Sequence, residues 1–195
     1  MISDAMTKLN GLILTGGRST RMGEDKSQLI YHEKSQREHL TDLLKPYCSV
    51  VFWSVNVTQA TELIDSEQLR IVDAFDLPGP LNGILSAFMY DPEAAWLVVA
   101  CDMPLLTVQS IDALVKQRNG AKLATVFYDS DGQLPEPLLG IYEPAFGRVT
   151  QQAIKEGIYS PRQLLQQNDI QLLTAPAVRE LTNINDPAAR AALVL

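Results

Sequence analysis

The sequence is poor in cysteine, in long apolar runs and in positive charge. Its 195 residues include only two cysteines, which is too few for a disulfide framework in a chain of this length. No apolar run approaches the about 18 residues that a membrane-spanning helix needs. The opening segment, MISDAMTKLN, lacks the apolar core of a signal peptide. We therefore expect a soluble, cytoplasmic protein without a membrane contact.

Positive charge is outnumbered by negative charge. The chain has 16 Lys and Arg residues against 23 Asp and Glu residues, a formal net charge of -7 at pH 7. A protein that binds nucleic acid along an extended surface normally carries an excess of cations, so we expect no nucleic-acid partner. Hydrophobic residues make up 46% and charged residues 20%, a balance typical of globular domains. We predict a single domain over residues 1–195, long enough to bury a sizeable core.

Short apolar runs alternate with helical patterns. Several runs are apolar throughout, which is typical of strands covered on both faces of a parallel sheet. Residues 81–90 have apolar side chains at helical spacing, and Thr107 can cap a second helix over residues 107–120. The alternation predicts an α/β fold, Rossmann-like and doubly wound, with a mostly parallel sheet. The predicted strands are residues 9–15, 49–55, 70–74, 95–101 and 122–128, and another apolar strand follows Pro137.

A glycine-rich, locally basic loop follows the first predicted strand. We call residues 15–26, TGGRSTRMGEDK, the glycine loop. Gly16 and Gly17 have no Cβ, so the backbone can turn sharply there and present its N–H groups to an anion, while Arg21 and Lys26 add positive charge. The spacing matches neither the dinucleotide fingerprint nor the P-loop, and a plain glycine turn with solvated cations is the alternative. Ligands of open α/β sheets bind beyond the carboxyl ends of the strands, which favours phosphate binding.

The same segment resembles the signature L-x-G-G-x-S-x-R-M-G-x-D-K of the molybdenum cofactor guanylyltransferases, the MobA-like nucleotidyltransferases. Three further segments look like family segments in the same order: DAFDLPGPLNG (73–83), CDMP (101–104) and NINDP (183–187). The resemblance implies a Rossmann-like fold of the nucleotide-diphospho-sugar transferase type. It also implies an enzyme that transfers GMP from GTP to the phosphate of molybdopterin, with Mg²⁺, and releases pyrophosphate. The fixed positions of the signature are Leu14, Gly16, Gly17, Ser19, Arg21, Met22, Gly23, Asp25 and Lys26.

The resemblance also implies roles for single residues. Asp102 would be the metal ligand, and Lys26, Arg21 and Asp102 would be the catalytic residues. Asn183 and Asn185 would lie on the acceptor side. GTP and a molybdopterin-type acceptor would be the binding partners, and other proteins of molybdenum cofactor assembly are further candidates. The nucleotide would be bound by Leu14, Thr15, Gly16, Gly17, Lys26, Asp73, Gly79, Pro80, Leu81 and Gly83.

The residues themselves suit such chemistry. Asp102 ends a buried strand, where a carboxylate must be paired, hydrogen-bonded or bound to a metal, and Mg²⁺ takes one or two carboxylates together with phosphate oxygens. A helix N-cap is the alternative role for Asp102, and Asp73 either contacts the nucleotide or simply ends its strand. An ionised phosphate needs no general base to attack. His32 and His39 lie in a polar stretch and are predicted to be solvated. Lys26 is the predicted cation at the reacting phosphates.

Two positions depart from the family pattern. Glu136 stands where the family usually has a histidine before proline, on the acceptor side. It either pairs with a nearby cation or accepts hydrogen bonds from the amino and ring N–H groups of a pterin. The second predicted strand lacks the family's base-contacting asparagine, and Ser54 and Asn56 are the candidates to replace it. The alternative functions are a related nucleotidyltransferase that uses CTP or a sugar-1-phosphate, and a non-catalytic nucleotide-binding partner in cofactor assembly.

Overall fold

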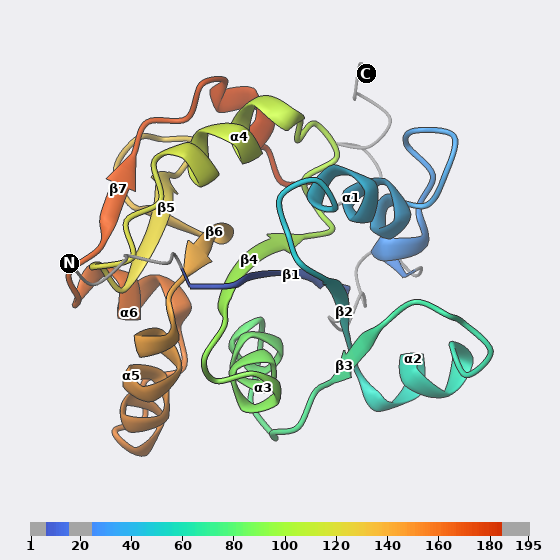
Figure 1. The fold of residues 1–195 in the computed structure, drawn as a ribbon, viewed down its shortest axis with the longest axis horizontal. Helices are drawn as coiled ribbons and strands as arrows, with labels where there is room; N and C mark the ends of the chain where they lie inside the picture. The colour runs from blue at the N-terminus through green and yellow to red at the C-terminus, as the bar shows by residue number, and fades with distance from the viewer. Residues whose placement is uncertain (1–6, 16–24, 185–195) are drawn as a thin grey trace.

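The computed structural model describes residues 7–15 and 25–184. Within these residues a seven-stranded sheet lies at the centre, in the order β3-β2-β1-β4-β6-β5-β7, and helices cover both of its faces (Figure 1). The strands are β1 (Leu9–Leu14), β2 (Val51–Val55), β3 (Arg70–Val72), β4 (Ala95–Ala100), β5 (Ala124–Tyr128), β6 (Pro135–Tyr142) and β7 (Gln171–Leu173). The helices are α1 (Gln36–Leu44), α2 (Val57–Glu62), α3 (Leu81–Tyr90), α4 (Val108–Lys116), α5 (Pro144–Lys155) and α6 (Pro161–Gln166), with short 3-10 helices η1 (Lys26–Gln28) and η2 (Val178–Leu181).

Most neighbouring strands are parallel, as predicted. β1 pairs in parallel with β2 and β4, β2 with β3, and β5 with β7. β6 is antiparallel to both of its neighbours, β4 and β5. The chain passes from β5 to β6 through a short turn, whereas a parallel crossover needs about a dozen residues or more. Asp129 Oδ1 stabilises this turn by accepting hydrogen bonds from the backbone N–H groups of Gln133 (3.1 Å) and Leu134 (3.3 Å).

The predicted strands correspond to β1 to β5, and the apolar strand after Pro137 corresponds to β6. Helix α3 has the predicted bounds. Thr107 caps α4 as predicted, since its hydroxyl accepts a hydrogen bond from Gln109 N (3.2 Å), but the helix ends at Lys116 and not at Gly120. The three-residue strand β7 was not predicted, because a run of that length shows no periodicity.

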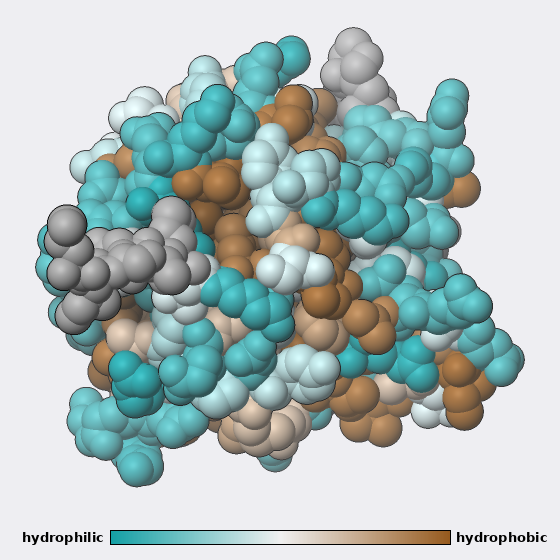
Figure 2. All heavy atoms as spheres, in the orientation of Figure 1, coloured by the Kyte–Doolittle hydropathy of each residue, from teal (hydrophilic) through white to brown (hydrophobic). Residues whose placement is uncertain are grey.

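Alternating side chains of the central strands pack into two apolar cores, one on each face of the sheet. Ile13 belongs to the core beneath α1 and α4, and its neighbour Leu12 belongs to the core beneath α3, α5 and α6. Both are fully buried, and burial of a side chain of this size stabilises a fold by about 1.5–3 kcal/mol. In Figure 2 hydrophobic residues show in the middle of the visible face, with mostly hydrophilic residues around them. No helix in the described part of the chain is long and apolar enough to cross a membrane.

The carboxyl ends of four strands meet at one edge of the sheet. Leu14, at the end of β1, is level with Ser54 of β2 and with Ala100 of β4, and Val55 is level with Val72 of β3. The residues that follow these strands are therefore brought together at this edge, the place where ligands of open α/β sheets bind. They are Thr15, Asn56, Asp73 and Cys101.

Candidate nucleotide-binding site

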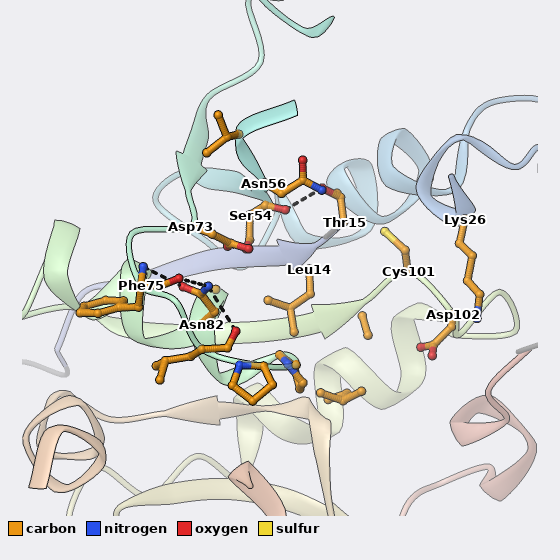
Figure 3. A pocket seen from close by; sticks show the side chains of 18 of the residues that line it. Leu14, Thr15, Lys26, Ser54, Asn56, Asp73, Phe75, Asn82, Cys101 and Asp102 are labelled. Carbon is orange, nitrogen blue, oxygen red and sulfur yellow. Dashed lines mark hydrogen bonds between the residues drawn. The ribbon is translucent and has the colours of Figure 1, made fainter. Parts of the chain in front are cut away.

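A cavity of about 1050 Å³ opens at this edge of the sheet (Figure 3). Its walls come from the ends of β1, β2 and β4, from η1, from the start of α2 and from the segment between β3 and α3. Pockets for small ligands typically measure about 300–1,000 Å³, so a nucleoside triphosphate fits within this volume. The predicted site residues that line it are Leu14, Thr15, Lys26, Asp73, Gly79, Pro80, Gly83 and Asp102.

The remaining predicted site residues do not line the cavity or lie outside the described residues. Leu81 is fully buried in the core beneath α3. Glu136 and Asn183, which were predicted on the acceptor side, are not among the residues that line the cavity. The residues outside the described ranges are Gly16, Gly17, Arg21 and Asn185.

Three polar side chains connect β1, β2 and β3 at the cavity. Thr15 Oγ1 donates a hydrogen bond to Ser54 O (2.6 Å), and Ser54 Oγ donates to Asp73 Oδ1 (3.1 Å). Burial raises the pKa of Asp73, and the hydrogen bond from Ser54 opposes that rise. Oδ2 of Asp73 has no hydrogen bond within the described part of the chain, so it remains an acceptor for the N–H or hydroxyl groups of a ligand.

Helix α2 begins at the cavity with a capping box. Asn56 Oδ1 accepts a hydrogen bond from Gln59 N (2.9 Å), and Gln59 Oε1 accepts one from Asn56 N (3.0 Å). The cap uses the carbonyl oxygen of the Asn56 side chain and leaves its amide nitrogen for other partners. Both candidates for base contact, Ser54 and Asn56, line the cavity, but only the hydroxyl of Ser54 is already bonded to a carboxylate.

The segment between β3 and α3 is held in place by the first turns of α3. Asn82 Oδ1 accepts a hydrogen bond from Phe75 N (3.2 Å), and Asn82 Nδ2 donates to Phe75 O (2.5 Å) and Leu77 O (3.5 Å). Ser86 Oγ accepts from Ala74 N (2.9 Å). Two side chains of one helix therefore fix the cavity rim that follows Asp73, and Figure 3 shows Asn82 pointing toward Phe75.

Lys26 and Asp102 meet at the other end of the cavity (Figure 3). Lys26 Nζ donates a hydrogen bond to Ile184 O (3.4 Å), and Ile184 N donates to Asp102 O (2.7 Å). Burial raises the pKa of Asp102, and the charge of Lys26 opposes that rise. Asp102 does not cap α4, because Thr107 is the N-cap. Within the described residues Asp102 Oδ1 is buried without a hydrogen-bond partner, and so is Asn183 Oδ1.

Glu136, at the start of β6, is buried beside this end of the cavity. Its Oε1 accepts a hydrogen bond from Leu138 N (2.9 Å), and its Oε2 lies 3.6 Å from Arg162 Nη2. Burial raises the pKa of Glu136, while the Leu138 N–H and the charge of Arg162 lower it. Oδ2 of Asp129 lies 3.5 Å from Nη1 of the same arginine. Glu136 thus has a cation 3.6 Å away and is bonded to the backbone of Leu138, which lines the cavity.

The two histidines are not solvated as predicted. Their rings stack with centroids 4.0 Å apart, and His32 Nε2 lies 2.8 Å from Pro104 O. Burial, together with the charge of His32, lowers the pKa of His39 to about 4. His39 belongs to α1, and His32 connects the segment before α1 to the loop that follows Asp102. Sequence reasoning missed the contact with Pro104 because it joins residues 72 positions apart in the chain.

Comparison with known proteins decides the family. Residues 11–172 match the MobA-like NTP transferase domain. The chain belongs to this family. The molybdenum cofactor biosynthesis bifunctional protein of Synechocystis sp. is 33% identical over 183 residues, which make up 94% of this chain and 53% of that protein. The chain therefore spans about half the length of that relative.

Two further MobA-like proteins align along most of their own length. The molybdenum cofactor guanylyltransferase of Pseudomonas putida is 28% identical over 186 residues, covering 94% of this chain and 96% of that protein. The solved structure of the molybdopterin-guanine dinucleotide biosynthesis protein A from Archaeoglobus fulgidus superimposes with a TM-score of 0.75 at 22% identity, covering 92% of this chain and 94% of that one. These likenesses agree with the family assignment, and the solved structure confirms the Rossmann-like fold.

Two polar residues that hold the segments around the cavity in place were not singled out from the sequence. Asn82 is the variable position of the Gly-Pro-Leu-x-Gly segment, and Gln59 belongs to a helix that was not predicted. The only local feature of the sequence that could have pointed to Asn82 and Gln59 is a polar side chain in the first turns of a helix that follows the end of a strand. Their hydrogen-bond partners, however, are set by the folded chain.

Proposed function

We propose that this chain transfers GMP from GTP to the phosphate of Mo-molybdopterin and releases pyrophosphate, which makes the guanine dinucleotide form of the cofactor. The observation that carries the proposal is the meeting of Lys26 and Asp102, joined through Ile184, at one end of a nucleotide-sized cavity. A cation and a carboxylate at the carboxyl ends of parallel strands suit the phosphates of a nucleotide and their counter-ion. The names of the Pseudomonas putida and Archaeoglobus fulgidus relatives support guanine as the base and molybdopterin as the acceptor.

In this reaction the protein contributes mainly by stabilising charge and not by covalent catalysis. An ionised phosphate oxygen of the acceptor attacks the α-phosphorus of GTP and forms a new P–O bond. The bond between the α-phosphorus and the oxygen bridging to the β-phosphate breaks, and pyrophosphate leaves with that oxygen and its electron pair. The attacking oxygen is already ionised, so no general base is needed. Lys26 stabilises the negative charge that builds up on the α-phosphate and the departing pyrophosphate.

Magnesium fits the donor atoms beside Lys26. Asp102 Oδ1 and Asn183 Oδ1 are buried oxygens without partners in the described part of the chain, and their segments are joined by the Ile184 N–H. Asp102 would hold the ion, and Asn183, whose neighbour Ile184 donates to Asp102 O, would be a second oxygen donor. Bound there, Mg²⁺ would neutralise phosphate charge. The described residues contain no group of three or more His, Cys, Asp or Glu side chains placed to hold a metal ion, so phosphate oxygens and water would complete the coordination.

The two ends of the cavity suggest where the substrates lie. Asp73 Oδ2 and the side-chain nitrogen of Asn56 are an acceptor and a donor without partners in the described chain, so we assign the nucleoside to that end. We choose Asn56 over Ser54 for base contact because the Ser54 hydroxyl is bonded to Asp73. The acceptor is assigned to the Asp102 end, where Asn183 and Glu136 lie. Glu136 would accept hydrogen bonds from the N–H groups of the pterin.

A panel of nucleotides and acceptors tests the proposal. Purified protein is incubated with GTP, CTP, ATP or UTP, with Mg²⁺, and with either molybdopterin or a sugar-1-phosphate, and pyrophosphate release is measured. Release only with GTP and molybdopterin supports the proposal. Release with CTP or with the sugar phosphate assigns the chain to a related nucleotidyltransferase activity. If the protein binds a nucleotide but releases pyrophosphate in no combination, it is a non-catalytic partner. In a separate test of the metal site, Asp102→Asn should raise the Mg²⁺ concentration needed for activity.

A further inference from the structure

Gln59, in the first turn of α2, joins the two ends of the glycine loop. Its Nε2 donates a hydrogen bond to Thr15 O (3.1 Å) at the start of the loop and another to Asp25 Oδ2 (3.0 Å) near its end. The side chain is almost completely buried. A single amide group therefore bridges the point where the chain leaves β1 and the point where it enters η1.

The orientation of this amide is fixed by all of its partners. Gln59 Oε1 accepts a hydrogen bond from Asn56 N (3.0 Å). A carbonyl and a carboxylate can only accept hydrogen bonds, and a backbone N–H can only donate one. Rotating the amide by half a turn would set its oxygen against two other oxygens. The contact between Gln59 and the glycine loop is thus specific for a residue that donates two hydrogen bonds and accepts one.

Asp25 passes this restraint on to Lys26. Asp25 Oδ1 accepts hydrogen bonds from Ser27 N (2.9 Å) and Ser27 Oγ (2.7 Å), and so caps η1, whose first residue is Lys26. Lys26 Nζ then reaches Ile184 O beside Asp102. A continuous series of contacts leads from Gln59 through the Asp25 carboxylate to the ammonium group proposed to stabilise the reacting phosphates.

We propose that Gln59 is a positioning residue that sets the distance between the two ends of the glycine loop and thereby aligns Lys26 with the nucleotide phosphates. This inference rests on the proposed nucleotidyl transfer. Gln59 itself touches neither nucleotide nor acceptor, because its amide is occupied by the protein. If the two hydrogen bonds donated by Gln59 are lost, nothing in its place joins Thr15 O to the Asp25 carboxylate, and the two ends of the loop can move apart. Lys26 then meets the phosphates less often in the reactive arrangement.

Two variants of Gln59 and one control test this. Gln59→Leu removes both donors. Gln59→Glu keeps the size and the acceptor for Asn56 N, but replaces the donor by an oxygen that faces Asp25. Gln68→Leu is the matched control: Gln68 Nε2 donates to Val51 O (2.9 Å), a backbone bond of the same kind remote from the glycine loop. GTP affinity, kcat and the unfolding midpoint are measured for each. We expect kcat to fall at least tenfold in both Gln59 variants, with Gln59→Glu the weaker enzyme, and Gln68→Leu to match the wild type.

A double-mutant cycle separates positioning from a general structural role. If Gln59 acts through Lys26, Gln59→Leu should lower kcat far less in a Lys26→Ala background than in the wild type. Equal losses in the two backgrounds, or wild-type kcat in both Gln59 variants, would overturn the inference. Absence of transfer by the wild-type protein would instead refute the proposed function. The Gln59 inference rests on that transfer and would fall with it, whereas failure of the inference alone leaves transfer by the wild-type protein intact.

Discussion

Helix α3 approaches β2 so closely at Gly83 that a β-carbon there would lie 2.2 Å from Ser54 Oγ. Ser54 in turn donates its hydroxyl to Asp73 Oδ1 (3.1 Å). The absence of a side chain at Gly83 therefore permits the contact that orients Asp73 in the cavity. This close approach also explains why a glycine stands inside α3, although glycine within a helix costs about 1 kcal/mol of stability relative to alanine.

Gly83→Ala should destabilise the protein by about 1–3 kcal/mol, because overpacking outweighs the gain in helix propensity. It should also weaken GTP binding, since Ser54 must move away from Asp73. Urea unfolding and equilibrium titration measure the two effects. Gly120→Ala is the control, because a β-carbon there meets nothing within 4 Å. Equal stability of the two variants would show that β2 and α3 adjust to the added methyl group without cost.

Lys26→Ala should lower kcat far more than it weakens GTP binding. Loss of one preorganised cation at developing phosphate charge typically costs about 3 kcal/mol, or roughly a hundredfold in rate. Steady-state kinetics with GTP and molybdopterin provide the measurement. Lys116→Ala is the control, since Lys116 is exposed and pairs with Asp112 on α4. Near wild-type turnover in Lys26→Ala would remove Lys26 from the mechanism.

The stacked histidines should make stability depend on pH. Burial and the charge of His32 lower the pKa of His39 to about 4, whereas an unfolded histidine titrates near about 6.5. The folded state thus favours neutral His39, and this stability is complete above about pH 6.5 and lost as the pH falls through about 4. With allowance for solvent screening at this half-exposed ring, we expect the wild type to lose about 1–2 kcal/mol more than His39→Gln on acidification. Urea unfolding at several pH values measures the difference, and parallel profiles would contradict it.

The fold and the site differ in how far the sequence predicts them. The continuous apolar runs predict β1, β2 and β4, because strands covered on both faces need apolar side chains at every position. Because Thr15, Asp73 and Asp102 all follow the carboxyl ends of strands at the same edge of the sheet, the sequence also predicts that they lie close together. Hydrogen bonds between side chains and distant backbone groups leave no periodicity, so the sequence could not predict that Gln59 reaches Thr15, 44 positions away along the chain.

Glu136 is the residue whose role is most open to test. It is almost completely buried, yet its Oε2 meets only Arg162 Nη2, at 3.6 Å, within the described residues. A buried carboxylate with a weakly engaged oxygen suits the amino and ring N–H groups of a pterin, which donate two parallel hydrogen bonds. Glu136→Ala should therefore raise the KM for the pterin acceptor at least several-fold and leave GTP affinity unchanged. Glu136→Gln keeps the bond from Leu138 N but presents one acceptor fewer, so it should raise the same KM by a smaller factor.

The competing role for Glu136 is that of a partner for Arg162 alone. In that case Glu136→Ala and Arg162→Ala should both lower the free energy of unfolding, because each breaks the same ion pair, and neither should alter the acceptor KM. Steady-state kinetics with varied molybdopterin, together with urea unfolding of both variants, distinguish the two roles. A raised acceptor KM in Glu136→Ala, beyond any change in Arg162→Ala, assigns the carboxylate to acceptor recognition. The opposite result leaves it a structural group that anchors α6 to the start of β6.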